Sequence, residues 1–240
     1  MEDKIVDVSN LSVSYYKNNE FRVHDVNFYL DKGEVMGIIG RNGAGKTTLL
    51  KSIAGLKGID SGEIFINGFK QGEDNKSIKK IIGYVSSEWM YDLTVKLEVQ
   101  AKNLGTYYDG FSYDRFGDIC ARLGIKKKSR PLFLSAGEKV KFTLAFALSH
   151  NPKLLVMDEP MSCLDPVSRD EIMDILREII EDGQVSIIYS THMIHELETI
   201  ADRILFMDSG CQKMFLDVNQ IQDKYFQGRK MDLEELFERL

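Results

Sequence analysis

One glycine-rich stretch constrains the fold of this chain more than any other. Residues 40–47 read Gly-Arg-Asn-Gly-Ala-Gly-Lys-Thr and match the pattern G-x-x-x-x-G-K-[ST]. A short apolar run at residues 35–39 precedes the stretch, and residues 47–54 have the pattern of a helix. A strand, a glycine loop and a helix in this order hold phosphate groups, so the chain is predicted to bind a nucleotide.

The glycines of this loop let backbone N–H groups curl around phosphates, and the N-terminus of the next helix adds partial positive charge. Lys46 is expected to reach the terminal phosphates, and the Thr47 hydroxyl is expected to bind a magnesium ion. The predicted phosphate-binding residues are Gly40, Asn42, Gly43, Ala44, Gly45, Lys46, Thr47 and Thr48.

Alternation of strands and helices predicts a mostly parallel sheet covered on both faces. Apolar runs without alternation are typical of buried parallel strands, and such runs occupy residues 154–157, 185–189 and 204–207. Helical patterns at residues 135–149 and 166–181 precede two of these runs. Ligands of such folds bind at the carboxyl ends of the strands, which is where the glycine loop falls.

Two other parts of the chain have a different character. Residues 5–30 alternate like strands of a half-exposed sheet. Residues 86–134 are mainly helical in pattern and are interpreted as a subdomain inserted into the α/β core. At 240 residues, the chain is long enough for one large α/β domain, or for one domain with a subdomain.

Composition and charge narrow the functional classes. No apolar run approaches the ~18–20 residues of a membrane helix, and residues 1–4 lack the layout of a signal peptide. The cysteines Cys120, Cys163 and Cys211 are widely spaced without a C-x-x-C pair, which fits a reducing compartment without a zinc site. A net charge of −6 disfavours nucleic acid as a ligand. We therefore expect a cytoplasmic protein that reaches a membrane only through a partner.

Acidic residues follow one of the predicted buried strands. Asp158 and Glu159 come directly after the run at residues 154–157, and a carboxylate there needs a cation or hydrogen bonds. Asp158 is suited to holding magnesium beside Thr47, and Glu159 is suited to activating a water molecule for attack on the γ-phosphate. His192 ends the strand at residues 185–189, where its imidazole could touch both the phosphate and that water.

The stretch Leu-Ser-Ala-Gly-Glu at residues 134–138 opens a helix. Ser135 is a natural N-cap, and the small residues after it leave backbone N–H groups accessible to an anion. Taken alone, Ser with Glu three residues later is common at helix starts.

Four stretches have now been described, and along the chain they follow in the order 40–47, 134–138, 158–159 and 190–192. In this order they resemble the ATP-binding subunits of ABC transporters along nearly the whole chain. The resemblance implies an α/β P-loop NTPase core with an N-terminal antiparallel β subdomain and an inserted helical subdomain. It also implies a Mg²⁺-dependent ATPase that pairs head to tail with a second copy or a homologous subunit. The residues that would act on ATP across that dimer are Ser135, Ala136, Gly137 and Glu138.

The resemblance assigns further roles by position. Residues 162–165 resemble the family's D-loop, His192 its switch histidine, and Tyr15 the aromatic residue that stacks on adenine, with Tyr16 as an adjacent alternative. The family has Gln after the strand at residues 81–85, where it senses magnesium and the membrane partner. Here Ser87 aligns best with that Gln, and Glu88 stands one position further.

The signature stretch departs from the family's LSGGQ at two positions. Ala136 replaces a glycine and keeps its N–H group, and Glu138 replaces Gln and adds a negative charge near a phosphate. If that charge points inward, it would slow closure of the dimer. We expect hydrolysis to survive both changes.

The predicted organisation is a single domain over residues 1–240 in four parts. These are a β subdomain with the P-loop core (1–87), a helical subdomain (88–134), the rest of the core (135–216) and a helical tail (217–240). Residues 89–91 form an apolar cluster that would fit either a docking groove or the local core. Apolar residues Leu233, Leu236, Phe237 and Leu240 predict an amphipathic tail helix, packed on its own domain or against a dimer partner.

The predicted function is an ATPase subunit that powers a separate permease from the cytoplasmic face of the membrane. The resemblance is to compact exporter subunits for drugs, lantibiotics or peptides. One alternative is an ATP-gated regulator or assembly factor of the same fold without a transport partner. A metabolic kinase is a second alternative, disfavoured by the signature stretch and the Asp158–Glu159 pair.

Overall fold

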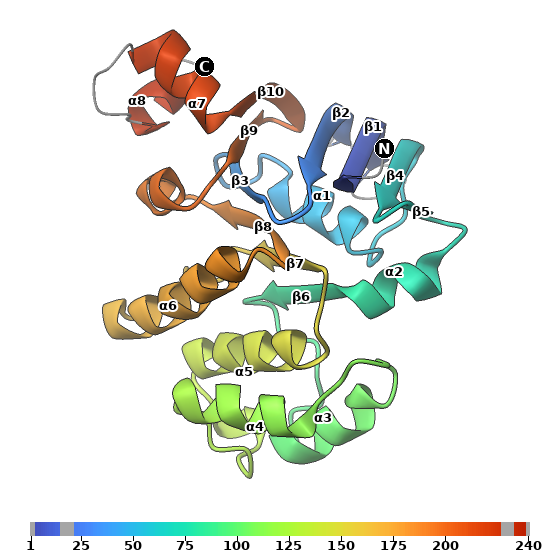
Figure 1. The fold of residues 1–240 in the computed structure, drawn as a ribbon, viewed down its shortest axis with the longest axis vertical. Helices are drawn as coiled ribbons and strands as arrows, with labels where there is room; N and C mark the ends of the chain where they lie inside the picture. Colours follow the sequence, from blue (N-terminus) through green and yellow to red (C-terminus); the bar gives the residue numbers. More distant parts are fainter. Residues whose placement is uncertain (1–2, 15–21, 227–232, 239–240) are drawn as a thin grey trace.

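The computed structural model describes residues 3–14, 22–226 and 233–238, including all of their side chains except those of Arg22, Phe237 and Glu238. Tyr15, Tyr16 and Leu240 therefore lie outside the described residues. Figure 1 shows an α/β molecule with the strands across the upper half and a helical part below. None of the described helices is both long and apolar enough to span a membrane.

The strands form one sheet in the order β5-β4-β1-β2-β10-β9-β3-β8-β7-β6. Their bounds are β1 Lys4–Ser14, β2 Arg22–Asp31, β3 Val35–Ile39, β4 Ser61–Ile66, β5 Phe69–Lys70, β6 Ile82–Ser86, β7 Leu154–Asp158, β8 Ser186–Thr191, β9 Arg203–Asp208 and β10 Cys211–Asp217. β9, β3, β8, β7 and β6 pair in parallel, and β1, β2, β4 and β5 pair antiparallel. The predicted parallel core and antiparallel N-terminal part are both confirmed.

Two hydrophobic clusters cover the two faces of this sheet. Leu49, Leu50 and Ile53 of α1 (Lys46–Ile53) pack with the strands of the N-terminal part on one face. The other face carries α5 (Ala136–Ser149) and α6 (Pro166–Asp182). Since alternate residues of a strand point to opposite faces, the parallel strands are apolar throughout, and β3 and β7 are buried along their whole length.

The helical part lies at the end of the sheet that carries β6 (Figure 1). It contains α3 (Leu97–Gly105) and α4 (Tyr113–Arg122). Phe116 of α4 packs on Phe142 of α5, and Leu97 and Ala101 of α3 belong to the same core cluster. Ser112 begins α4 by accepting a hydrogen bond from the Arg115 N–H. The short helices are α2 (Asn75–Ile81), α7 (Val218–Ile221) and α8 (Leu233–Glu238).

The tail helix packs on its own chain. Leu233 and Leu236 are buried in the core cluster that includes α5 and α6, and the Leu233 N–H donates to Glu198. The sequence left open whether this helix packs on its own domain or against a dimer partner. In the structure its described residues pack on their own domain.

Candidate functional site

The glycine loop lies between β3 and α1, at the carboxyl end of β3. Gly43 and Gly45 have positive φ angles of 83° and 103°, which glycine adopts without a side-chain clash. Gly45 precedes the first helical residue, Lys46, and has no side chain to cap the helix, so N–H groups of the first turn are left for an anion. A Cβ atom at Gly40 would lie 2.5 Å from the Met207 carbonyl oxygen, so the loop cannot pass β9 with a larger residue there.

The loop forms one wall of a cleft of about 640 Å³. Its lining comprises Asn42, Gly43, Ala44, Gly45, Lys46, Thr47, Thr48, Lys51, Lys57 and Glu159. All of the predicted phosphate-binding residues except Gly40 therefore line one cavity together with the predicted general base. Three lysines and the start of a helix give this cavity the positive charge that a polyphosphate requires.

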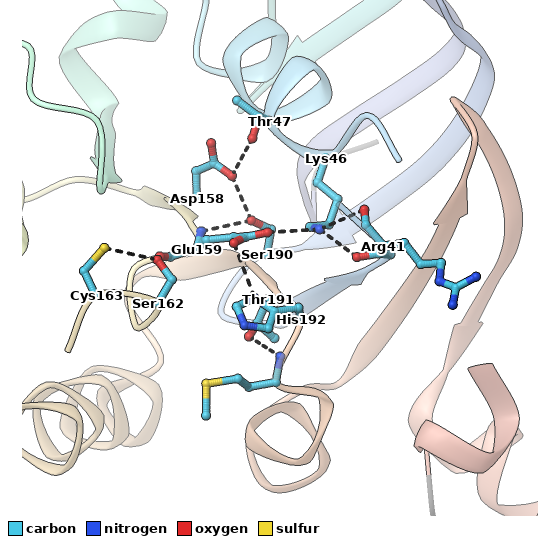
Figure 2. A network of polar contacts seen from close by, with 12 residues as sticks. Arg41, Lys46, Thr47, Asp158, Glu159, Ser162, Cys163, Ser190, Thr191 and His192 are labelled. Atoms are coloured by element: carbon cyan, nitrogen blue, oxygen red, sulfur yellow. Dashed lines mark hydrogen bonds and ion pairs between the residues drawn. The ribbon is translucent and has the colours of Figure 1, made fainter. Parts of the chain in front are cut away.

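Lys46 is almost completely buried, with 4% of its surface exposed. Its Nζ donates to the Gly40 carbonyl oxygen at 2.7 Å and to the Arg41 carbonyl oxygen at 3.3 Å. Nζ also forms an ion pair with Glu159 Oε1 at 3.0 Å (Figure 2). The ammonium group is thus held at the mouth of the loop by contacts that phosphate oxygens can replace.

Asp158 ends β7 and is buried beside Thr47. One carboxylate oxygen, Oδ1, accepts hydrogen bonds from Thr47 Oγ1 at 3.1 Å and from Ser190 Oγ at 3.0 Å (Figure 2). Burial raises the pKa of Asp158, and the two hydroxyl donors partly oppose that rise. A buried carboxylate next to a hydroxyl oxygen is a ligand set that suits Mg²⁺, and a cation there would offset the cost of burying the charge.

Glu159 adopts a positive φ of 46°, which is unusual for a residue with a side chain. Its N–H donates to the carbonyl and hydroxyl oxygens of Ser190, each at 3.1 Å, and its carbonyl oxygen accepts from Ser162 Oγ. Its second carboxylate oxygen, Oε2, lies 3.4 Å from His192 Nδ1. The backbone is therefore fixed on both sides, and the carboxylate is placed between Lys46 and His192.

The Ser135 helix begins with a complete capping box. The Glu138 N–H donates to Ser135 Oγ at 3.1 Å, and Glu138 Oε2 accepts from the Ser135 N–H at 2.8 Å. The Glu138 carboxylate thus turns back onto its own helix start. Ser135 and Ala136 are exposed, and none of residues 135–138 lines the described cleft at the glycine loop.

Ser87 and Glu88, the two candidates for the position of the family's Gln, follow β6 and have different surroundings. Ser87 is exposed, and its metal-binding role stays a prediction. Glu88 forms an ion pair at 2.5 Å with Lys51, which lines the cleft, and its N–H donates to Ser86 Oγ. Ser86 itself is buried at the end of β6, directly opposite Asp158 in the sheet.

Sequence reasoning assigned no role to Ser190, although its hydroxyl and carbonyl groups fix both acidic residues. The sequence does show a polar residue at the end of a buried strand, which could have pointed to Ser190. In the sheet, Ser190 pairs with Asp158. The predicted adenine-stacking residue, Tyr15, is outside the described residues. Lys46 and Glu159 are far apart in the sequence, and their ion pair depends on the order of the strands in the sheet, which the sequence pattern does not give.

Comparisons with known proteins agree with this geometry. Residues 23–162 match the family described as ABC transporter. The chain is 32% identical over 211 residues to the linearmycin resistance ATP-binding protein LnrL of Bacillus subtilis (strain 168), which covers 86% of this chain and 67% of that protein. It is 31% identical over 224 residues to the energy-coupling factor transporter ATP-binding protein EcfA1 of Staphylococcus aureus (strain MSSA476), over 88% of this chain and 81% of that one.

Solved structures show the same fold. The structure of an ATP-binding subunit of an ABC transporter superposes with a TM-score of 0.86 and 26% identity, covering 98% of each chain. A dimeric ATP-binding cassette bound to ADP and phosphate superposes with a TM-score of 0.78 and 24% identity, covering 89% of this chain and 98% of that one.

Proposed function

Because the chain belongs to the ABC transporter family as an ATP-binding ATPase subunit, we propose that two copies enclose ATP and Mg²⁺ and drive a separate membrane permease. The observation that supports this most is that Lys46 and Glu159 meet at one cleft, with His192 3.4 Å from Glu159 and with Asp158 bonded to Thr47. This set contains a phosphate-binding cation, a general base and a place for magnesium.

Each residue then has a defined task. Lys46 and the loop N–H groups bind the terminal phosphates. Thr47 and Asp158 would hold Mg²⁺, which would neutralise charge on the transferring phosphate. Phosphate oxygens that bind Lys46 replace its contact with Glu159. The freed carboxylate accepts a proton from the attacking water, and His192 orients the water and the γ-phosphate.

The second half of the site is proposed to come from a partner copy arranged head to tail. The exposed start of α5 supports this, because Ala136 and Gly137 present N–H groups there that are suited to the γ-phosphate of ATP held by the partner. Gly137 also approaches Leu164 of the D-loop stretch, where a Cβ atom would lie 2.9 Å from Leu164 Cδ2. At the same helix start, the Glu138 carboxylate is engaged by the Ser135 N–H in the capping box.

The permease is proposed to dock on a groove of about 820 Å³ between α2 and α3. Exposed apolar side chains support this, since Met90 is 51% and Tyr107 73% exposed there. Trp89 and Tyr91 instead pack on Phe142, so the cluster at residues 89–91 belongs partly to the core and partly to the groove. Docking would place the chain on the cytoplasmic face of the membrane.

We propose an exporter of a drug, lantibiotic or peptide as the transporter served. Similarity to LnrL, whose name records linearmycin resistance, supports this cargo class. Recovery of a hydrophobic permease with the tagged chain from solubilised membranes would separate this function from an ATP-gated regulator. Efflux of a candidate drug, lantibiotic or peptide from cells that express this chain and the permease would then test the direction of transport.

Hydrolysis tests the site itself. Glu159→Gln should bind ATP as the parental chain does and hydrolyse it about 10²- to 10³-fold more slowly, because the base is lost while the shape is kept. Lys46→Ala should lose nucleotide binding, as measured with a fluorescent ATP analogue. Glu181→Gln, an exposed change on α6, serves as the matched control. Parental turnover by Glu159→Gln would refute the assignment of the base.

A further inference from the structure

The side chain of His192 has little to hold it in place. It is 51% exposed, and the polar contact of its ring is with Glu159, whose Oε2 atom lies 3.4 Å from His192 Nδ1. No hydrogen bond anchors the ring within the described parts of the chain. The direction in which the ring points is therefore set by the backbone on either side of it.

A run of hydrogen bonds fixes that backbone. Thr191, the last residue of β8, accepts a hydrogen bond from the Met193 N–H at 2.8 Å with its Oγ1 atom (Figure 2). The same hydroxyl group donates to Glu196 Oε2 at 3.4 Å. Glu196 belongs to a 3₁₀ helix, Ile194–Thr199, just after His192, and its N–H donates to the Met193 carbonyl oxygen. The turn that carries His192 is thus closed by Thr191 on one side and by Glu196 on the other.

Glu196 is held in turn by Tyr189, whose side chain is completely buried. Tyr189 Oη donates to Glu196 Oε2 at 2.5 Å. Burial, together with the nearby charge of Glu196, raises the pKa of Tyr189, so the phenol keeps its proton and remains the donor. A hydroxyl hydrogen bond to a carboxylate is short and about twice as strong as one between neutral groups. This bond ties the turn to the buried core.

The strand β8 holds the other side of the His192–Glu159 contact as well. Adjacent residues of a strand point to opposite faces, so Ser190 points away from Tyr189 and Thr191. The hydroxyl oxygen of Ser190 accepts from the Glu159 N–H at 3.1 Å. The end of one strand therefore fixes Glu159 on one face and the turn with His192 on the other.

We propose that Glu196 is a positioning residue for ATP hydrolysis and holds His192 against Glu159. This inference rests on the proposed function and adds a residue that does not line the cleft itself. Glu196 acts only through the place of the imidazole, and a displacement of about 1 Å at a reacting group can cost on the order of 10²-fold in rate. Loss of Glu196 should therefore slow the chemical step and leave ATP binding unchanged.

The first test measures ATP hydrolysis by the purified full chain over a range of ATP concentrations. Glu196→Ala should lower kcat about tenfold and change KM by less than about twofold. Tyr189→Phe keeps the buried ring and removes one hydroxyl group, so it should lower kcat as well, by a smaller factor. This second variant decides the question if Glu196→Ala fails to fold.

The matched control is Glu198→Ala. It removes a carboxylate from the same 3₁₀ helix, but that carboxylate accepts from the Leu233 N–H of the tail instead. The control should retain the parental kcat. An equal loss of kcat in the control would overturn the proposal, because any loosening of this helix would then have the same effect.

A double-mutant cycle separates positioning from general damage. His192→Ala removes the group that Glu196 is proposed to position, so the addition of Glu196→Ala should cause no further loss of kcat. Two losses that multiply would overturn the proposal. Parental kcat in both Glu196→Ala and Tyr189→Phe would overturn it too.

A second readout needs no ATP. In the chain labelled at histidine, Glu159→Gln should shift the NMR signals of the His192 ring, because it alters a group 3.4 Å away. These signals are identified by their loss in His192→Ala. The same Glu159→Gln substitution in the Glu196→Ala background should shift them much less. An equal shift in both backgrounds would contradict the placement of His192 by Glu196.

The two readouts keep this proposal apart from the proposed function. If the parental chain did not hydrolyse ATP while the His192 signals still depended on Glu196, the hydrolytic function alone would be refuted. Parental hydrolysis rates in the Glu196 and Tyr189 variants would refute only the positioning role.

Discussion

Asp158 illustrates how a single residue can be costly for the fold and necessary for function. Its carboxylate is buried and accepts two hydroxyl hydrogen bonds, and burial raises its pKa. An acid whose folded pKa exceeds its unfolded value lowers stability as pH rises through that interval, because the unfolded state releases its proton more readily. At neutral pH the charge therefore destabilises the fold until a cation binds.

Asp158→Asn should accordingly raise the free energy of unfolding by about 1 kcal/mol without nucleotide or metal. It should also abolish Mg²⁺-dependent ATP hydrolysis, because the proposed Mg²⁺ ligand is lost. Urea unfolding at pH 7 and a phosphate-release assay measure the two effects. A variant that is less stable than the parental chain would contradict the account of the buried charge.

Glu138 gives a second prediction at this scale. The sequence left open whether its charge points toward the partner's phosphate, and in the structure its carboxylate accepts from the Ser135 N–H. Glu138→Gln keeps a capping acceptor, so ATP turnover should change by less than about threefold. Glu138→Ala should cost about 1 kcal/mol of stability, because one half of the capping box is lost. A tenfold rise in turnover for Glu138→Gln would show that the charge does oppose closure.

Among the elements, those with strong local signals were predicted from the sequence. Helix α6 matches the helical pattern at residues 166–181, and it begins where Asp165 accepts from the Ser168 N–H, with Pro166 in the first turn. β7 and β8 followed from continuous apolar runs. Local signals were weaker elsewhere: α2 is short and polar, and β10 is half-exposed and depends on pairing with β9, which only the folded sheet provides.

His150, just after the end of α5, is expected to make the stability of the fold depend on pH. His150 follows the last residue of this helix, is buried, and stacks on Tyr108 with ring centroids 4.1 Å apart. Burial lowers its pKa to about 4 from an ordinary value of 6.5. A histidine with a lowered folded pKa stabilises the fold above its unfolded pKa, and that stability is lost as pH falls from about 6.5 toward 4.

Lowering the pH from 7 to 5 should therefore cost the parental chain about 2 kcal/mol more stability than it costs His150→Gln. Urea unfolding of both proteins at the two pH values measures this difference. The comparison cancels the titration of groups that both proteins share. The same pH dependence in both proteins would contradict the assignment to His150.

At the scale of the whole molecule, the sheet order brings distant parts of the sequence to one cleft. β3 and β7 both pair with β8, so the glycine loop, the Asp158–Glu159 pair and His192 meet at the carboxyl ends of these strands. The motifs predicted which residues would meet. The Lys46–Glu159 contact and the role of Ser190 required the three-dimensional arrangement.

One copy of the chain does not supply the whole proposed site, because residues 135–138 lie outside the cleft that contains Lys46 and Glu159. The central claim is that a second copy completes it. Because Glu159→Gln is expected to bind ATP and hydrolyse it slowly, it should favour the closed pair. Glu159→Gln combined with Ser135→Arg should not pair, because a long cation would block the contact across the interface.

Size-exclusion chromatography with light scattering tests this claim most directly. With ATP and Mg²⁺, Glu159→Gln should elute at twice the mass of the 27.4 kDa chain and return to the monomer mass when ATP is withdrawn. The double variant with Ser135→Arg should stay at the monomer mass while binding ATP with unchanged affinity. Elution of Glu159→Gln as a monomer with ATP and Mg²⁺ bound would contradict the account.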